Sequence, residues 1–424
     1  MTGWKRGQLG ESVEVQGGYA FKSRDFVDDG IPVVRMSNIK DGRLSFETAK
    51  YLPPHKIDSH RPFLLKEGDI ILGMSGSIEN FAVVKEQDLP AILNQRVGRF
   101  LVKDENKMDR NFLRYVITSH SFKNKVMESA AGAAQLNISP RQLQAIDISY
   151  PPLPEQRKIA AILSTVDGDI EQTEMIIDQA EKVKKGLLER LLMKGIGHGE
   201  YKKTEIGEIP AQWKVVALKD YVKEYRGGAS ITPKDFSEKG TKVLPKKGVS
   251  SRGIFDIPAN EQSFVSVGFS RRNPRSSVDR SFLITVLRDL VPSGPNIGRI
   301  VQIDDDDCYM LAQGVYGFKL TEGLNETFLI YLSNASYFRK EMKRKLVGST
   351  QVHMRTGDFF DTLIPLPDFR EQRQIADILF HVDEKIRKEH RKLNELRKLK
   401  KGLMQVLLTG RVRVEATGKE AEAL

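Results

Sequence analysis

The chain has 424 residues, of which 40% are hydrophobic and 29% are charged, a balance typical of globular proteins with packed cores. This composition excludes a disordered chain, and the single cysteine, Cys308, excludes internal disulfides and thiolate metal clusters. No apolar run approaches the roughly 20 residues that a membrane-spanning helix needs, and the polar N-terminal stretch lacks the apolar core of a signal peptide. We therefore expect a cytoplasmic protein with no membrane partner.

The charge balance is basic. Lys and Arg number 67 against 56 Asp and Glu, which gives a formal net charge of +11. Such an excess suits binding to nucleic acid, although many proteins that bind none share it. The excess is spread over both halves of the chain, so it does not mark one basic tail. The net charge alone therefore does not distinguish a nucleic-acid-binding protein from one that binds no nucleic acid.

Residues 1–150 are predicted to form a first α+β lobe. Short β-branched runs at 31–35, 69–72 and 82–84 predict strands, and a helix is expected near 109–128. Arginine suits guanine edges and phosphates, and asparagine suits adenine edges, so basic and amide side chains in the loops are candidates for DNA contact. Their other interpretation is an ordinary solvated surface. The candidates are Lys22, Arg24, Arg35, Asn38, Lys40 and Arg43.

Residues 151–199 are predicted to contain a long helix. Pro154 and Glu155 are start signals, and the glycine-rich stretch 195–199 is a stop signal. Apolar side chains between them recur in an alternating four-and-three spacing, the a/d seam of a coiled coil. The seam positions are Ile159, Leu163, Val166, Ile170, Ile177 and Leu187.

Residues 200–366 are predicted to form a second α+β lobe, with strands at 282–287, 299–303 and 316–320 and a helix near 325–346. The strongest basic cluster runs from Arg271 to Arg280, with four arginines in ten residues. Candidate DNA-binding residues in this lobe are Lys246, Lys247, Arg252, Arg271, Arg272, Arg275 and Arg280.

Residues 367–412 are predicted to form a second long helix, which begins at Asp368 and Glu371 and ends at Gly410. The remaining residues, 413–424, are expected to be a disordered tail. The seam positions of this helix are Ile375, Leu379, Val382, Ile386, Leu393 and Leu403.

The chain repeats itself. Residues 155–187 align without gaps with 371–403, and 15 of these 33 positions are identical. The lobes repeat only in scaffold positions, such as Gln95 and Gln313. We therefore expect a pseudo-two-fold internal repeat, in which two similar lobes are separated by two long helices that pair as an antiparallel coiled coil. The alternative is that each helix packs only on its own lobe.

Two pairs of unusual helix residues fall at equivalent positions of the repeat. Lys184 and Lys400 lie on the seam, where they either fix its register or extend to solvent at its edge. Gly186 and Gly402 lie in mid-helix, where glycine costs about 1 kcal/mol relative to alanine. A close approach of another helix or partner, or a local kink, would explain these glycines.

No catalytic signature was found. The sequence contains no phosphate-binding loop of the Walker type and no dinucleotide-binding glycine fingerprint, and its seven histidines have no metal-ligand spacing. The run Asp304 to Asp307 is interpreted as an acidic hairpin turn rather than a metal site, because the first lobe has a polar turn in the same place. Asp368 with Glu371 and Arg373 suggests a nuclease motif but lacks its lysine. We therefore expect a non-catalytic chain without a metal or a bound cofactor.

The openings of the two helices carry a family likeness. The stretches PPLPEQRKIA at 151–160 and FREQRQIA at 369–376 resemble the helix openings of Type I restriction–modification specificity subunits. The likeness extends to the KKGL stretches at 184–187 and 400–403, to GGYAF at 17–21, and to Gly132 and Gln135. The second opening departs from the pattern, because its Pro-Leu-Pro lies at 365–367 rather than directly before Glu371.

The resemblance implies a DNA-binding subunit whose two target-recognition domains each read half of a split, asymmetric site in double-stranded DNA. The helices would set the spacing and dock two modification (methyltransferase) subunits. S-adenosylmethionine is then expected only on those partners, and ATP and Mg²⁺ on restriction/translocase subunits.

Three other interpretations remain. The chain could be a coiled-coil scaffold or regulator that binds protein partners only, or a self-sufficient DNA methyltransferase or nuclease. It could also be the specificity subunit of a related two-subunit restriction system.

Overall fold

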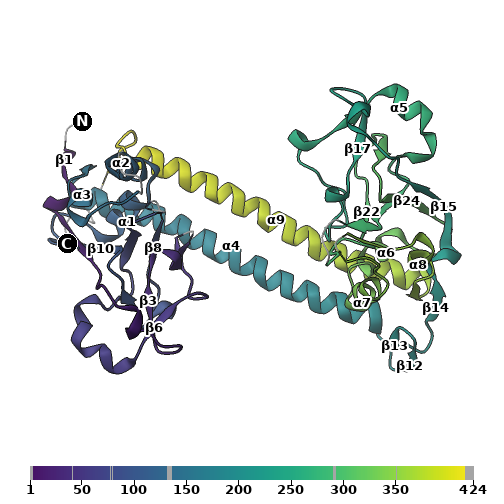
Figure 1. Ribbon diagram of the computed structural model, residues 1–424, viewed down its shortest axis with the longest axis horizontal. Coiled ribbons are helices and arrows are strands. Elements are labelled where there is room, and N and C mark those ends of the chain that lie inside the picture. The colour runs from purple at the N-terminus through teal and green to yellow at the C-terminus, as the bar shows by residue number, and fades with distance from the viewer. Residues whose placement is uncertain are drawn as a thin grey trace. The chain divides into compact units, whose positions relative to one another are not determined.

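The computed structural model describes residues 3–40, 42–76, 78, 80–130, 136–289, 293–349 and 351–415. Gly132, Gln135 and most of the predicted tail lie outside these residues. The chain divides into two compact units, one made of residues 1–174 and 392–424 and the other of 175–391. Each unit contains one lobe, the start of one long helix and the end of the other. Both lobes mix helices with sheets, which confirms the α+β class (Figure 1).

The first lobe is built on a four-stranded antiparallel sheet in the order β2-β10-β7-β8. A smaller sheet, β6-β3-β9, lies beside it, with β3 and β9 parallel. The strands are β1 (Lys5–Gln8), β2 (Val13–Gly17), β3 (Ile31–Val34), β4 (Ile39–Lys40), β5 (Arg43–Leu44), β6 (Lys50–Leu52), β7 (Ile70–Gly73), β8 (Phe81–Val83), β9 (Ile92–Leu93), β10 (Val97–Val102) and β11 (Asp147–Tyr150). The helices are α1 (Arg110–Thr118), α2 (His120–Ala130) and α3 (Pro140–Gln144).

The second lobe repeats this plan, with a four-stranded sheet β15-β24-β20-β22 and a five-stranded sheet β16-β18-β17-β23-β19. Its strands are β12 (Tyr201–Thr204), β13 (Gly207–Pro210), β14 (Lys214–Ala217), β15 (Val222–Gly227), β16 (Phe236–Ser237), β17 (Thr241–Leu244), β18 (Phe264–Val265), β19 (Ser277–Val278), β20 (Leu283–Val286), β21 (Arg288–Asp289), β22 (Ile300–Gln302), β23 (Tyr309–Leu311), β24 (Val315–Leu320), β25 (Val352–His353) and β26 (Leu363–Leu366). Its helices are α5 (Val267–Arg272), α6 (Glu326–Leu332), α7 (Ser336–Arg344) and α8 (Thr356–Phe360).

The single helix predicted near 109–128 is wrong, because two helices meet there at Ser119. The backbone of Ser119 is extended, and its hydroxyl accepts a hydrogen bond from Phe122 N at 3.2 Å, which caps the start of α2. The prediction near 325–346 fails in the same way. There the helix is interrupted after α6 and resumes as α7, at whose start the side chain of Glu189 accepts a hydrogen bond from Ser336 N at 3.0 Å. Helical periodicity continues across such breaks, so it did not reveal them.

The two long helices are α4 (Leu153–Lys194) and α9 (Phe369–Leu407). Gly195 directly follows α4, and its φ of 65° is that of a left-handed helix terminus. Gly410, with φ of 69°, lies three residues beyond the end of α9. All the seam positions named above are buried or half-buried, and Ile159, Leu163 and Ile375 are completely buried. Among the described residues, no helix is both long and apolar enough to span a membrane.

Within each unit the two helices contact each other. In the first unit Lys400 of α9 lies 2.6 Å from Asp167 of α4, and Arg397 lies 2.8 Å from Glu174. In the second unit Lys184 of α4 lies 2.5 Å from Asp383 of α9. In each unit, the start of one helix therefore lies beside the end of the other.

Candidate nucleic-acid interface

The predicted DNA-binding residues of the first lobe fall into two groups. Lys22, Arg24 and Lys40 are exposed, and none of them has an ion-pair partner among the described residues. Arg43 is exposed but is tied to Glu174 of α4 at 2.8 Å. Burial opposes ionisation of Glu174, but the hydrogen bonds from Arg43 and Arg397 outweigh it and lower the pKa of this carboxyl.

The remaining two candidates of this lobe shape the loop instead of facing solvent. Asn38 is completely buried: its side-chain oxygen accepts a hydrogen bond from Arg35 N at 3.0 Å, and its amide nitrogen donates to Ser45 O at 3.0 Å. Arg35 is half-buried and donates to Thr48 O at 2.7 Å. A completely buried amide whose oxygen and one N–H are bonded inside the loop is not available to a base edge, so we remove Asn38 from the candidate set.

The arginine cluster of the second lobe lies at the end of α5 and in the turn that follows it. Arg271, Arg272 and Arg275 are all exposed, and no ion-pair partner is found for them among the described residues. Arg280 is also exposed but pairs with Asp306. Three unpaired guanidiniums on one short stretch are well suited to contact phosphates or guanine edges.

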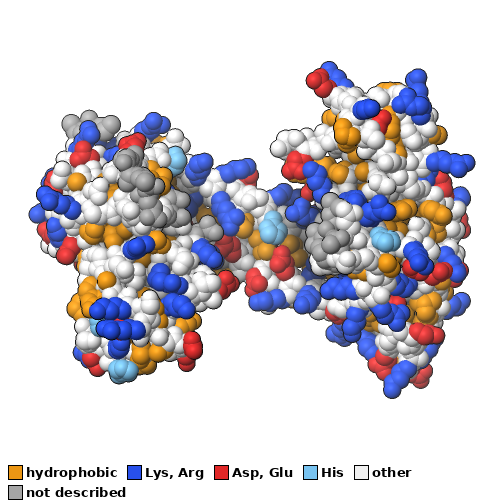
Figure 2. All heavy atoms as spheres, in the orientation of Figure 1, with side chains coloured by type: hydrophobic (Ala, Val, Ile, Leu, Met, Phe, Trp, Pro, Cys, Tyr) orange, Lys and Arg blue, Asp and Glu red, His pale blue; other side chains and the backbone are white. Residues whose placement is uncertain are grey.

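The other candidates of the second lobe each have a neighbour that limits them. Lys247 pairs with Glu261, and Arg252 contacts Asp256 at 2.7 Å. Lys246 is half-buried, and burial together with the nearby Arg288 lowers its pKa. Exposed ion pairs such as these are worth only about 0–1 kcal/mol, so Lys247 and Arg252 remain available to a stronger anion. Figure 2 shows Lys and Arg side chains over both units on the face in view, rather than in one patch.

The structure adds a surface that the sequence analysis did not assign, the turn between β9 and β10. Gln95 and Arg96 are exposed there, and Gln95 N donates to Tyr19 O at 3.0 Å. Tyr19 is 43% exposed and packs against His60, with ring centroids 4.4 Å apart. The repeated glutamine, which recurs as the exposed Gln313, was the available signal, but it was interpreted only as scaffold.

The acidic run of the second lobe is occupied by ion pairs. Lys242 pairs with Asp307, Arg280 pairs with Asp306, and Asp305 accepts a hydrogen bond from the Tyr309 hydroxyl at 2.7 Å. Across the described ranges, no three His, Cys, Asp or Glu side chains converge as a metal site would require. The sequence interpretation of this run as a turn fits its position between β22 and β23.

The repeated Glu-Gln at the helix openings ties each helix to its lobe. Gln156 accepts a hydrogen bond from Asp109 N at 2.9 Å and donates to Lys107 O at 2.9 Å. Gln372 makes the equivalent bonds, from Asn325 N at 2.8 Å and to Gly323 O at 3.0 Å. Both glutamines are completely buried, so the motif fixes where each helix leaves its lobe.

The glutamates of the same motif bind the segment that follows the opposite helix. In the first unit Glu155 accepts two hydrogen bonds from Arg413, each of 2.7 Å. In the second unit Glu371 accepts hydrogen bonds from Trp213 Nε1 at 2.9 Å and Ile196 N at 3.0 Å. The chain is therefore held in place at Arg413, within the stretch for which we predicted a disordered tail.

The mid-helix glycines leave open surface. A side-chain Cβ built on Gly186 or Gly402 would meet nothing within 4 Å, and both residues are exposed. Neither glycine is therefore needed for close packing within the described chain, and α4 and α9 are unbroken at these positions. Each helix thus has an exposed stretch of backbone, without a side chain over it, at the equivalent position of the repeat.

Comparison with known proteins shows the class to which this architecture belongs. The family model described as the Type I restriction modification DNA specificity domain matches residues 1–182 and again 210–398. The chain belongs to this family, and the resemblance seen at the helix openings is confirmed.

Particular relatives cover nearly the whole chain. It is 29% identical over 408 residues to the Type I restriction enzyme MjaVIII specificity subunit of Methanocaldococcus jannaschii, which spans 95% of this chain and 88% of the relative. It is 22% identical over 398 residues to the EcoBI specificity subunit of Escherichia coli, covering 88% and 78% of the two chains. The solved S subunit of M. genitalium has the same fold, with a TM-score of 0.58 at 14% identity over 95% of this chain and 96% of that one.

Proposed function

We propose that this chain is the sequence-specific DNA-binding subunit of a Type I restriction–modification complex. Each lobe reads one half of a split, asymmetric site in double-stranded DNA, and the subunit acts in the cytoplasm without catalysing a reaction itself. The observation that carries the proposal is the duplication. The family domain occurs twice, with the scaffold kept and the loops changed, as two readers of different sequences would require.

The exposed cations without ion-pair partners support a contact with DNA in both lobes. Lys22, Arg24 and Lys40 serve the first lobe in this proposal, and the Arg271, Arg272 and Arg275 cluster serves the second. Phosphate contacts position a protein on the duplex, while base contacts specify the sequence. A mixture of lysines and arginines on loops of a rigid scaffold supplies both kinds of contact.

The helices supply the spacing and the docking surface in this proposal. The buried seams and the repeated Lys–Asp pairs support an antiparallel coiled coil of α4 and α9. The exposed patches at Gly186 and Gly402 support the docking of two modification subunits, one for each copy of the repeat. S-adenosylmethionine belongs to those partners, and ATP with Mg²⁺ to restriction/translocase subunits.

An exchange of lobes tests the proposal. Residues 1–150 are replaced by the equivalent lobe of a relative with a different target, and DNA from cells that also make the modification subunit is mapped for methylation. We expect one half of the methylated site to change and the other to stay. A change in both halves would contradict independent reading by the lobes.

A gel shift separates this function from a scaffold that binds only protein. The chain and its modification subunit are incubated with duplex that carries the mapped site and with an excess of random competitor. Retention of the specific duplex is expected. If no duplex is preferred while the protein complex forms normally, the chain is a protein scaffold.

A further inference from the structure

In the first unit, the junction between the lobe and α4 is closed by a polar network. Arg43 contacts Glu174 of the helix at 2.8 Å, and Lys85 pairs with Glu171 one turn earlier. All four side chains bridge the lobe to the helix. Their charges compensate one another, so this edge of the junction needs no further partner.

The inner part of the same junction is also polar and satisfied. Arg114 of α1 donates to Asp167 of α4 at 2.8 Å, and the Tyr115 hydroxyl donates to the same carboxylate at 2.7 Å. Ser164 completes the network, with its hydroxyl 3.1 Å from that of Tyr115.

The second unit keeps the tyrosine and the aspartate but replaces the rest of this network. The repeat offset that aligns the helices places Ile330 where the first unit has Arg114, Phe380 where it has Ser164, and Arg387 where it has Glu171. Tyr331 still donates to Asp383, at 2.9 Å. The junction of the first unit is therefore polar and bridged by ion pairs, whereas the equivalent junction of the second unit is apolar, with Arg387 at its edge.

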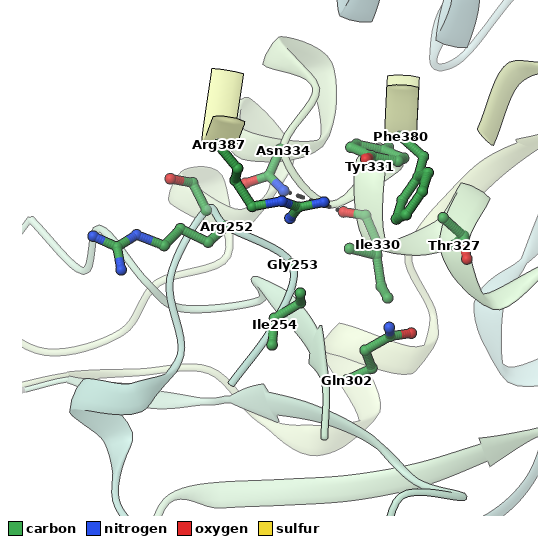
Figure 3. Close-up of a pocket in the computed structure, with 11 residues that line it drawn as sticks. Arg252, Gly253, Ile254, Gln302, Thr327, Ile330, Tyr331, Asn334, Phe380 and Arg387 are labelled. Carbon is green, nitrogen blue, oxygen red and sulfur yellow. Dashed lines mark hydrogen bonds between the residues drawn. The ribbon is translucent and has the colours of Figure 1, made fainter. Parts of the chain in front are cut away.

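These replacements leave a pocket, shown in Figure 3. Ile254, Ile330 and Phe380 give it an apolar lining, Gln302 and Thr327 lie on one side, and Arg387 of α9 extends across it. Phe380 is 44% exposed. None of the described residues that line the pocket is acidic. An apolar pocket with a polar rim marks a binding site more often than a flat surface does.

Two arginines line the pocket, Arg252 and Arg387, and Arg387 of α9 is the one that extends across it and would hold an anion there. It lies over the Phe380 ring at 5.6 Å and donates from Nε to Glu384 at 2.6 Å, one turn away on the same helix. Both members of this ion pair are partly exposed, at 33% and 46%, so the pair is weak. A guanidinium has five donors, which leaves some for a second carboxylate.

We propose that this pocket seats an acidic segment of the modification subunit, with an apolar side chain against Phe380 and Ile330 and a carboxylate on Arg387. The inference rests on the proposed function, since it names a contact of the partner that the helices dock. A protein segment fits better than a DNA phosphate, because a phosphate gains nothing from an exposed phenylalanine and a lining of two isoleucines. Among the described residues, ion pairs bridge the first junction whereas the second carries this pocket, so the two modification subunits are held inequivalently.

The test converts the second junction into the first. The double variant Ile330→Arg/Phe380→Ser carries the residues that the first unit has at these two positions. In the first unit the equivalent arginine contacts an aspartate and a tyrosine, and the second unit keeps both as Asp383 and Tyr331. Stepwise dissociation constants for the purified modification subunit are measured by native mass spectrometry with the full chain. We expect one of the two steps to weaken about tenfold or more, as loss of an aromatic anchor typically does, while the other step is unchanged.

Two single variants keep the test independent of how well the double variant folds. Arg387→Gln removes the guanidinium charge together with its weak pair to Glu384, and should weaken the same step several-fold, less so at high salt. Val267→Ser removes a 53% exposed apolar side chain elsewhere in the lobe and should change neither step. Circular dichroism and thermal unfolding check that each variant is folded.

The outcomes are separable. If the wild-type chain binds two modification subunits and the folded variants bind them equally well, the pocket is not the docking site. Equal weakening of both steps would also overturn the proposal, as would intact partner binding with weaker retention of duplex DNA, which would assign the pocket to a phosphate. If the wild-type chain binds no modification subunit, the proposed function itself fails.

Discussion

Removing one heptad from each long helix tests whether the helices set the spacing of the DNA half-sites. The segments 170–176 of α4 and 386–392 of α9 are equivalent in the repeat and span one heptad each, so both seams stay in phase. The helix pairs Asp167–Lys400 and Lys184–Asp383 lie outside the removed segments. At 1.5 Å per residue, each helix becomes about 10 Å shorter.

The double deletion should fold, because both helices lose one whole heptad and the remaining seam positions keep their pairing, although Ile170 and Ile386 of the seam and the contact of Glu174 with Arg397 are lost. Glu171 and Glu174 are removed, and with them the ion pairs to Lys85 and Arg43. These pairs are partly exposed and are worth about 0–1 kcal/mol each. Because Arg387 is also removed, the modification subunit is supplied in excess so that weakened docking does not obscure the result.

The measurement is methylation mapping of random duplex DNA. A rod about 10 Å shorter corresponds to about three base pairs at 3.4 Å each. The variant should therefore prefer half-sites about three base pairs closer, or lose specific binding if the changed helical phase no longer presents both half-sites. Unchanged methylation at the original spacing would refute the ruler and leave the helices as a docking surface.

The deletion of one heptad from α4 alone is the matched control. Asp167 and Lys184 are as far apart in α4 as Asp383 and Lys400 are in α9, so a one-sided deletion prevents both pairs from forming together. One charged partner is then left without its mate, a change that costs about 3–5 kcal/mol when the pair is buried. Lys400 and Asp167 are 31% and 27% exposed, which places the cost for that pair below this range. We expect a clear loss of stability against denaturant.

Three further predictions concern individual side chains. Lys184→Met should lower the free energy of unfolding by about 2–4 kcal/mol in denaturant, because it leaves the carboxylate of Asp383 buried without its cation. Adding Asp383→Leu should recover most of the lost free energy of unfolding. Additive losses in the double variant would contradict the pairing. Burial works against ionised Glu155, but hydrogen bonds from Arg413 and the Val414 backbone outweigh it and lower its pKa. The pair thus stabilises the fold above the ordinary carboxyl pKa of about 4.3, and this contribution is lost as the pH falls through the lowered value. Arg413→Gln should accordingly reduce the melting temperature at pH 7, with a difference from wild type that shrinks in acid; a constant difference would refute the assignment. Replacing one arginine of the cluster with alanine should have one of two effects. Loss of a base contact costs about 1–3 kcal/mol of binding free energy and relaxes the base preference at one position of the second half-site, whereas loss of a phosphate contact weakens binding to all sequences alike. If none of the three variants changes affinity or base preference, the cluster is not part of the interface. The three positions are Arg271, Arg272 and Arg275.

The long helices were predictable because their signal is periodic and repeated. Seam positions such as Ile159 and Ile375 are defined by spacing alone, and burial at those positions follows from it. The role of Lys184 was not predictable, because its partner Asp383 lies 199 positions away and no local pattern connects them. The structure pairs Lys184 with Asp383 and Lys400 with Asp167, while both lysine side chains stay partly exposed, at 23% and 31%.

The candidate site was harder to predict because loop residues have no periodicity. Asn38 was selected because an asparagine side chain can bond adenine. The sequence does not distinguish an exposed asparagine from a buried one that bonds the backbone of its own loop, as Asn38 does. Arg43 was selected on the same ground, although it is tied to a glutamate of α4 that is 131 positions away. Among the described residues, the exposed arginines of the α5 turn kept both the chemistry and the exposure without an ion pair that the prediction assumed, as did Lys22, Arg24 and Lys40 of the first lobe.

The Glu-Gln motif explains why a likeness of sequence at the helix openings accompanies a likeness of architecture. The glutamine bonds the turn before α1 or α6, so it fixes the lobe to the start of its own helix. The glutamate bonds Arg413 or the His198 segment, each of which follows the end of the opposite helix. Two neighbouring side chains thus join three segments from distant parts of the sequence. A motif with this task must occur once for each lobe, and any lengthening or shortening of one helix without the other would act directly on it.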